Sequence, residues 1–182
     1  MQTTRILKAL VVYDSKTGNT EKVSKAIYDT LVEAKVETTL IKTDTASGDL
    51  YDYDLVFMGT PTFQWMPSKE IQQFINDKFA IHKKRGDVKL LAPAIPGKKA
   101  VAFCTYSSPF TGIDSAIPCV KYMAQFFRHI GFEIGGEWYV IGEFVGNEER
   151  STKGKLGDIR GRPNQADLDE IRNKVIALLK TF

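Results

Sequence analysis

A run of hydroxyl-bearing residues, Ser15-Lys16-Thr17-Gly18-Asn19-Thr20, has the residue types and spacing of an anion-binding turn. It lies between the apolar run 9–12 and segment 23–34, in which apolar residues recur at helical spacing, so we expect a buried strand, a tight turn and an amphipathic helix. A helix N-terminus presents unpaired N–H groups and the positive end of the helix dipole. Gly18 lets the backbone curl so that several N–H groups converge, and the three hydroxyls add further donors. This pattern favours binding of a phosphate monoester.

Two common phosphate-binding motifs do not fit this run. A P-loop requires Gly-x4-Gly-Lys-Ser/Thr, and a dinucleotide-binding turn requires Gly-x-Gly-x-x-Gly. Neither is present, because Gly18 is the only glycine in the run. A Ser/Thr-rich helix cap that binds nothing is the competing interpretation.

Two later segments, 60–67 and 105–112, combine hydroxyls with aromatic side chains. The first of them contains two prolines and therefore cannot be helical. Each follows an apolar run, 55–59 or 100–104, that has the composition of a buried strand. Both segments are thus expected to be loops that leave the ends of core strands.

The apolar pattern predicts five strands that alternate with helices. The expected strands are 5–13, 36–41, 55–59, 100–104 and a strand within 132–144. The expected helices are 18–34, 68–79, 115–130 and a last helix capped by Asn164 and Asp167. The expected connections are 43–53, 80–97 and 145–163. This alternation argues for an α/β fold with a parallel sheet and helices on both faces. Ligands bind such sheets at the carboxyl ends of the strands, where loops 14–20, 60–66 and 105–112 are expected to meet.

Length and composition are those of one globular domain spanning residues 1–182. Hydrophobic residues make up 43% and charged residues 26%, and no apolar run is long enough for a membrane span. Asp14 interrupts the N-terminal apolar run too early for a signal peptide. Cys104 and Cys119 have no metal-ligand or Cys-x-x-Cys spacing, which is typical of reduced thiols in a cytoplasmic protein. The chain offers no metal cluster and no Ser-His-Asp or Cys-His set, so no catalytic residue is assigned.

The net charge of +3 is small but unevenly distributed. Seven basic residues and one acid, Asp87, lie between Lys78 and Lys99. Such a run is typical of a solvated loop. Nucleic-acid binding would require a larger basic excess interleaved with aromatic residues, so a nucleic-acid partner is not expected.

With its three loops in view, the chain resembles the flavodoxin-like family. The run 15–20 matches that family's Ser/Thr-x-Thr-Gly-x-Thr phosphate loop in the right place after the first strand. The resemblance implies a three-layer α/β/α sandwich whose five-stranded parallel sheet has the order 2-1-3-4-5. It also implies an FMN cofactor, and flavodoxin is itself a known case of ligand binding where the strand order reverses.

In this resemblance the first loop holds the phosphate, and the second and third loops hold the isoalloxazine ring. The implied FMN-binding residues are Ser15, Lys16, Thr17, Gly18, Asn19 and Thr20, then Pro61, Thr62, Phe63, Gln64 and Trp65, and then Thr105, Tyr106, Ser107, Phe110 and Gly112. Aromatic side chains suit the faces of a flavin ring. Four of them are available in the two ring loops, although Phe110 has a competing interpretation as a core residue.

The second loop departs from the electron-carrier flavodoxins, which commonly have glycine beside the flavin N5. There the peptide turns to stabilise the semiquinone. Here Gln64 and Trp65 follow Phe63, and positive φ is costly for both residue types. The sequence therefore predicts less blue semiquinone than a glycine-bearing flavodoxin gives. The mildly basic charge also differs from the strongly acidic electron carriers.

Three functions are compatible with these observations. The first is an FMN-binding electron-transfer protein that serves a redox partner protein. The second is an FMN-dependent NAD(P)H:quinone reductase with a quinone-like small acceptor, because Gly59-Thr60-Pro61-Thr62 resembles the second loop of the flavodoxin-fold quinone reductases. The third is a binding module that has the fold but no flavin. In either redox function the cofactor supplies the chemistry and the protein positions it.

Overall fold

The computed structural model describes residues 6–43 and 48–182, so residue 5 of the first expected strand and residues 44–47 of the expected connection 43–53 lie outside it. Within the described residues, five strands form one parallel sheet in the order β2-β1-β3-β4-β5, which confirms the predicted order. The strands are β1 (Lys8–Tyr13), β2 (Glu37–Lys42), β3 (Leu55–Pro61), β4 (Lys99–Tyr106) and β5 (Glu133–Ile141).

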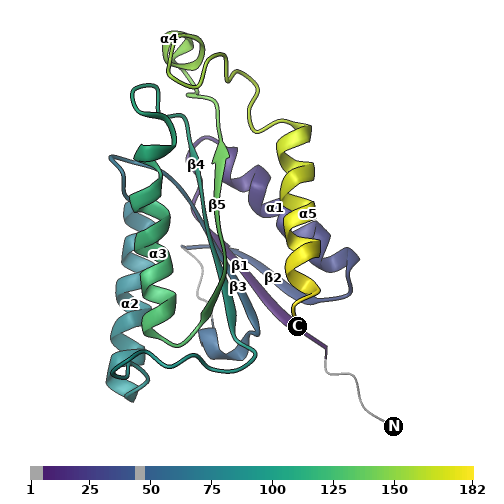
Figure 1. Ribbon diagram of the computed structural model, residues 1–182, viewed down its shortest axis with the longest axis vertical. Coiled ribbons are helices and arrows are strands. Elements are labelled where there is room, and N and C mark those ends of the chain that lie inside the picture. The colour runs from purple at the N-terminus through teal and green to yellow at the C-terminus, as the bar shows by residue number, and fades with distance from the viewer. Residues whose placement is uncertain (1–5, 44–47) are drawn as a thin grey trace.

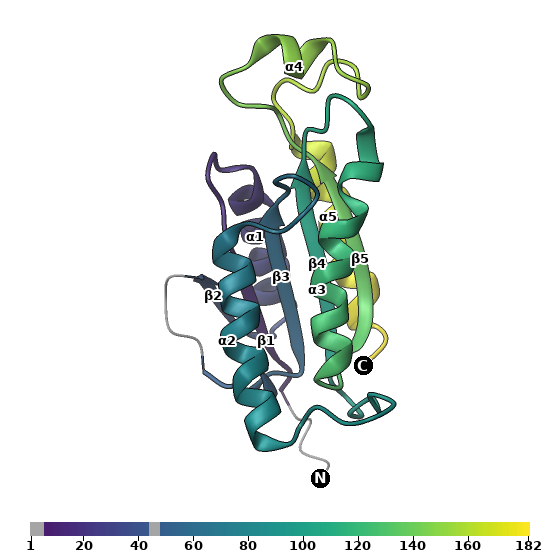
Figure 2. The same cartoon turned by 90° about the vertical axis from the view of Figure 1, so that its left-hand side faces the viewer.

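Helices cover both faces of this sheet, as expected for a three-layer sandwich. Helices α1 (Asn19–Glu33) and α5 (Gln165–Leu179) lie on one face, and α2 (Lys69–Arg85) and α3 (Ile117–His129) lie on the other (Figures 1 and 2). In the described part of the chain, three short helices lie in the connections: η1 (Leu50–Asp52), η2 (Gly112–Ser115) and α4 (Glu148–Thr152). The α4 segment lies beyond the carboxyl ends of β4 and β5 (Figure 1).

The core consists of two apolar layers, one on each face of the sheet. Alternate residues of a strand point to opposite faces, so Leu10 and Val12 of β1 pack in the α2–α3 layer. Ala9 and Val11 pack in the α1–α5 layer. All four side chains are fully buried, which explains why β1 is apolar at consecutive positions.

The strand register brings the predicted loops to one edge of the sheet. Tyr13 pairs with Gly59, and Gly59 pairs with Phe103, so β1, β3 and β4 reach that edge at the same level. Pro61 pairs with Thr105 at the end of β3 and β4. The segments that follow these three strands therefore start side by side.

Two predicted connections contain α-helix. Helix α2 continues through Arg85, so the prediction that residues 80–97 form a connection is wrong for its first six positions. Gly86, at φ 80°, ends the helix, and the basic residues of its last turn are favourable at the negative end of the helix dipole. Segment 145–163 was expected to be loop, but it includes α4, whose N-cap Asn147 accepts a hydrogen bond from the Arg150 N–H.

The start of the last helix is confirmed. The Asn164 side chain accepts from the Asp167 N–H, and the Asp167 carboxylate accepts from the Asn164 N–H, which forms a capping box. Among the described residues, no helix is both long and apolar enough to cross a bilayer, and no cluster of three or more His, Cys, Asp or Glu could hold a metal ion. Cys104 and Cys119 are buried free thiols.

Candidate functional site

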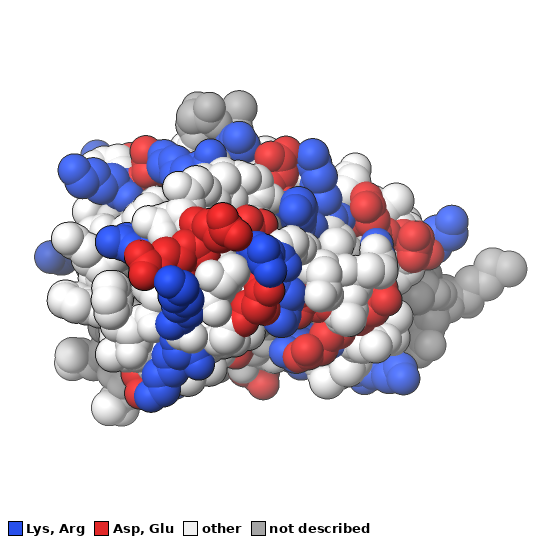
Figure 3. All heavy atoms as spheres, turned by 90° about the horizontal axis from the view of Figure 1, so that it is seen from above, with Lys and Arg blue, Asp and Glu red and all other residues white. Residues whose placement is uncertain are grey.

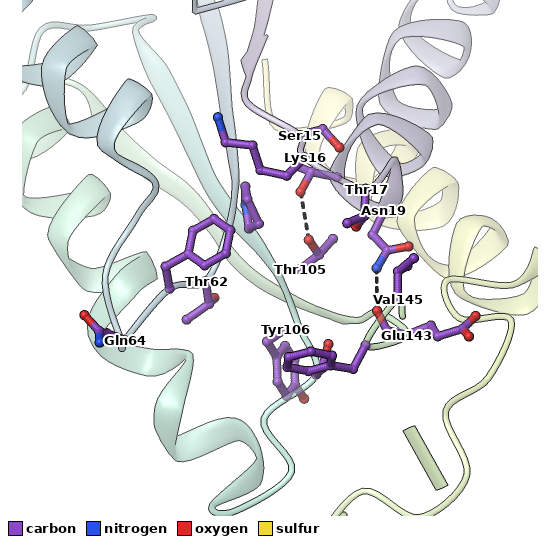
Figure 4. A pocket seen from close by; sticks show the side chains of 15 residues that line it. Ser15, Lys16, Thr17, Asn19, Thr62, Gln64, Thr105, Tyr106, Glu143 and Val145 are labelled. Carbon is purple, nitrogen blue, oxygen red and sulfur yellow. Dashed lines mark hydrogen bonds between the residues drawn. The ribbon is translucent and has the colours of Figure 1, made fainter. Parts of the chain in front are cut away.

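A pocket with a cavity of about 290 Å³ lies at the carboxyl edge of the sheet (Figure 4). All three predicted loops line it, together with a fourth segment that follows β5. The lining residues are Ser15, Lys16, Thr17, Asn19, Thr20, Pro61, Thr62, Phe63, Gln64, Thr105, Tyr106, Ser107, Glu143, Phe144 and Val145. The predicted Gly18, Trp65, Phe110 and Gly112 are not among the residues that line it.

The first loop is a closed turn at the start of α1. Ser15 Oγ accepts hydrogen bonds from the Gly18 N–H and the Glu21 N–H, each at 3.2 Å. Gly18 has φ 95°, a left-handed conformation that glycine adopts without strain. Within the described residues, the N–H groups of Lys16, Thr17, Asn19 and Thr20 have no acceptor. Together with the Ser15 and Thr17 hydroxyls, they form a set of donors suited to a phosphate group.

The Thr20 hydroxyl joins the first loop to the third. Its Oγ1 lies 2.8 Å from Thr105 Oγ1 at the end of β4, and the two hydroxyls are joined by a hydrogen bond (Figure 4). Both residues are buried, with 1% and 4% of their surface exposed. Thr20 is therefore a link within the pocket wall as well as a polar lining residue.

The Lys16 side chain points away from the hydroxyls of its own loop (Figure 4). Its Nζ lies 2.6 Å from Glu70 Oε1 at the start of α2 and 3.5 Å from Asp14 Oδ2. The hydrogen bond to Glu70 is the main cause that raises the pKa of Lys16, and the same bond lowers the pKa of Glu70. Lys16 thus carries its charge on the side of the pocket that faces α2.

The second loop is a two-residue turn closed by two hydrogen bonds. The Phe63 N–H donates to the Met66 carbonyl and the Met66 N–H donates to the Phe63 carbonyl, each at 2.9 Å. Gln64 and Trp65 between them have φ values of 45° and 69°. Both residues thus adopt the positive φ that is costly for their residue types. The paired hydrogen bonds hold the turn in a conformation that normally selects glycine or asparagine.

We expect this turn to store backbone strain that glycine would relieve. Left-handed backbone costs a non-glycine residue about 1–2 kcal/mol, while glycine loses about 0.5–1 kcal/mol through the entropy of the unfolded chain. A Gln64→Gly variant should therefore be more stable by about 0.5–1 kcal/mol, measured as a higher urea midpoint at an unchanged slope. Gln64→Ala is the matched control, because it removes the same side chain but keeps the strain. An equal gain in both variants would contradict this account.

Thr62 leaves a buried polar atom without a partner at the floor of the pocket. Its N–H donates to the Thr105 carbonyl at 3.0 Å, but its Oγ1 is buried and has no hydrogen-bond partner among the described residues. An orphaned hydroxyl of this kind costs free energy unless a ligand or water satisfies it. The Cys104 thiol is a neighbour of this hydroxyl without a hydrogen bond of normal geometry; burial raises the pKa of that thiol well above its usual range, and Thr62 opposes the rise only weakly. A buried, protonated Cys104 has the character of a structural residue.

The third loop begins within β4, which continues through Thr105 and Tyr106. Tyr106 lines the pocket but is only 8% exposed, and burial raises the pKa of its phenol. Phe110 is 79% exposed, so the alternative interpretation of it as a core residue is wrong. Gly112 is buried at the start of η2, where the Leu156 side chain covers it.

Sequence reasoning did not anticipate residues 143–145, which form the remaining wall of the pocket. Asn19 Nδ2 donates to the Glu143 carbonyl at 2.9 Å and so ties this wall to the start of α1 (Figure 4). The buried Ser151 hydroxyl of α4 accepts from the Phe144 N–H at 3.1 Å and donates to the Phe144 carbonyl at 3.2 Å. No motif marks these residues in the sequence.

The comparisons with known proteins support the flavodoxin-like fold. The family model described as flavodoxin domain matches residues 10–85, which include the first two loops of the pocket. The flavodoxin-like domain-containing protein BilS of Clostridioides difficile is 33% identical over 79 residues. That match covers 43% of this chain and 43% of BilS, so it spans less than half the length of this relative.

Solved structures resemble the whole chain. Oxidised flavodoxin 1 from Bacillus cereus superposes with a TM-score of 0.68 at 16% identity, over 96% of this chain and 99% of that one. The chain therefore has the flavodoxin-like fold. Rubredoxin oxygen:oxidoreductase from Desulfovibrio gigas also superposes, with a TM-score of 0.64 at 15% identity, over 96% of this chain but 35% of that one. The flavodoxin-like fold is therefore found both alone and as part of a longer protein.

The match to the flavodoxin domain model implies FMN as the cofactor, and the donors in the pocket fit that molecule. Unpaired N–H groups at the start of α1 suit its phosphate, and the orphaned Thr62 Oγ1 offers a hydrogen bond to a polar edge of the ring. Phe63 and Tyr106 supply aromatic surface.

The face at the α4 end carries interspersed basic and acidic side chains and no field of one sign (Figure 3). This surface therefore differs from that of a uniformly acidic carrier.

Proposed function

We propose that the chain, as one domain spanning residues 1–182, binds FMN in this pocket and transfers electrons to a redox partner protein. The observation that carries the proposal is the meeting of a phosphate-type helix N-terminus with two aromatic loops around one cavity. Bound FMN supplies the group that accepts and donates electrons. The residues of the chain bind it, orient it and limit its contact with water.

The proposed roles follow the pocket wall. Ser15, Thr17 and the N–H groups of the first turn hold the phosphate. Thr62 and Ser107 offer hydrogen bonds to the ring, while Phe63 and Tyr106 cover its faces. Lys16 is held at the α2 side by Glu70 and places a positive charge at the rim of the pocket.

A specific observation also favours the second candidate, an FMN-dependent NAD(P)H:quinone reductase. A second cavity of about 400 Å³ adjoins the pocket, and Lys16, Phe63 and Gln64 line both. It extends to Met66 and to the start of α2. A reductase needs room for a nicotinamide or a quinone beside the flavin, and this cavity lies where such a molecule would meet the ring loop.

The purified protein should bind FMN at one site per chain, seen as quenching of FMN fluorescence during titration. Anaerobic addition of NADH or NADPH to the complex then separates the two redox functions. Rapid bleaching of the flavin absorbance supports the reductase, whereas a yellow protein inert to both nucleotides supports the electron carrier. Failure to bind FMN would contradict both redox functions and would favour the third function, a binding module that has the fold but no flavin.

A further inference from the structure

The end of the molecule opposite the pocket carries a loop with two adjacent leucines whose side chains are fully exposed to solvent. Residues 86–98 connect α2 to β4 at the end away from α4 (Figures 1 and 2). Within this connection Leu90 is 95% exposed and Leu91 is 102% exposed. Single exposed apolar residues are common on soluble proteins. Two adjacent leucines that are fully exposed to water indicate a surface that contacts another molecule or a membrane.

The backbone holds these leucines outward at a conformational cost. Leu91 and Ala92 have φ values of 64° and 41°, which non-glycine residues seldom adopt. The Ala92 N–H closes the turn by donating to the Lys89 carbonyl at 3.1 Å. If this segment only connected α2 and β4, glycine at these positions, or leucines turned into the core, would give a more stable fold.

The turn is anchored on both sides. Before it, Val88 packs against the core layer under α2 and α3. After it, the Ile95 N–H donates to the Gly131 carbonyl at 2.8 Å, and the Ile95 side chain covers Gly131. The leucines therefore project from a fixed base.

Uncompensated positive charge flanks the leucines. Lys83, Lys84 and Lys89 are exposed, and within the described chain none of them forms an ion pair. The single acid of this stretch, Asp87, is already occupied by Arg85 and His82. Residues 83–92 thus combine a net positive charge with an apolar tip, and we name this segment the lysine–leucine tip.

We propose that the lysine–leucine tip attaches the protein to the surface of an anionic lipid bilayer. Leucine side chains at such a surface enter the boundary between headgroups and acyl chains, and lysines are attracted by the negative lipid headgroups. An apolar groove on a protein could accept the leucines, but it would make no use of three unpaired lysines. Attachment by this end leaves the pocket, at the other end of the sheet, facing away from the lipid.

The test is cosedimentation of the full chain with vesicles of phosphatidylcholine that contain phosphatidylserine. The protein should bind these vesicles at low salt, bind pure phosphatidylcholine vesicles much less, and be released as salt screens the lysines. A Leu90→Ser/Leu91→Ser variant should lose about tenfold or more in partition coefficient, because two large apolar side chains no longer enter the boundary. A Lys83→Glu/Lys84→Glu/Lys89→Glu variant should lose at least as much.

Matched controls separate the tip from general surface effects. Ile176→Ser removes a 45% exposed apolar side chain from α5, and Lys153→Glu reverses an exposed charge beside α4. Both should bind vesicles as the unaltered protein does. The substituted tip residues are exposed, so circular dichroism and FMN affinity should not change. Absence of vesicle binding, equal binding to neutral vesicles, or unchanged binding of the leucine variant would each overturn the proposal.

Discussion

FMN is expected to bind about tenfold or more weakly to a Thr17→Val variant than to the unaltered protein. Thr17 is exposed in the first loop, and its hydroxyl lies beside N–H groups that have no acceptor among the described residues. A hydrogen bond to a charged oxygen contributes about 1.5–3 kcal/mol, and 1.4 kcal/mol corresponds to a factor of ten in the dissociation constant. Valine keeps the shape of threonine and removes only the donor.

Riboflavin supplies the control, because it carries the same ring without the phosphate. Its affinity should be equal for both proteins, and fluorescence titration measures both ligands in one format. Thr152→Val is a matched variant, since it removes a hydroxyl that bonds within α4, and should leave FMN affinity unchanged. Equal weakening of FMN and riboflavin by Thr17→Val would show that this residue acts on the fold or the ring and not on the phosphate.

The largest effect on stability is expected from Gly59→Ala in the centre of the sheet. A β-carbon at this position would lie 2.1 Å from Phe103 Cζ, and Phe103 is fully buried beside it on β4. Atoms cannot approach so closely, so the ring must move within a packed core. Such overpacking costs typically 1–3 kcal/mol and occasionally more. For a chain of this size each kcal/mol lowers the melting temperature by about 2–4 °C.

A double-mutant cycle identifies the cause of this loss. Phe103→Leu removes the part of the ring that would collide, so Gly59→Ala should cost less in that background than alone. Gly48→Ala is the control, because a β-carbon there meets its nearest atom at 3.5 Å, an ordinary contact. Additive losses from Gly59→Ala and Phe103→Leu would contradict a direct clash.

Much of the fold follows from short-range patterns in the sequence. Runs of consecutive apolar residues indicate β1, β3 and β4. Between these strands apolar residues recur at helical spacing, and a helix that connects two strands of one sheet is typical of parallel strands. Because parallel strands bring their carboxyl ends to one edge, three of the four pocket walls could be inferred without coordinates. The fourth wall, 143–145, could not, since its position depends on a long-range hydrogen bond from Asn19 to the Glu143 carbonyl.

The errors have local physical causes. The polar, basic last turn of α2 hides the end of this helix in the apolar pattern, although Gly86 is a helix-stop signal. Residue preference opposes the left-handed turn at Gln64 and Trp65, and two backbone hydrogen bonds overcome that preference, which the sequence alone does not reveal. The charge of segment 78–99 was visible in the sequence, whereas the full exposure of Leu90 and Leu91 depends on how the loop packs.

The hydrogen bond between Thr20 and Thr105 connects the two halves of the pocket. It joins helix α1, whose first turn carries N–H groups without an acceptor among the described residues, to strand β4, which ends at Tyr106. We expect a ligand that orders one side of this bond to order the other side too, so that occupation of one half favours occupation of the other. Coupling of this kind is reciprocal. If an anion in the first loop raises the affinity for a ring by some factor, the ring raises the affinity for the anion by the same factor. We therefore expect a phosphate in the first loop and a ring in the other half of the pocket to bind cooperatively.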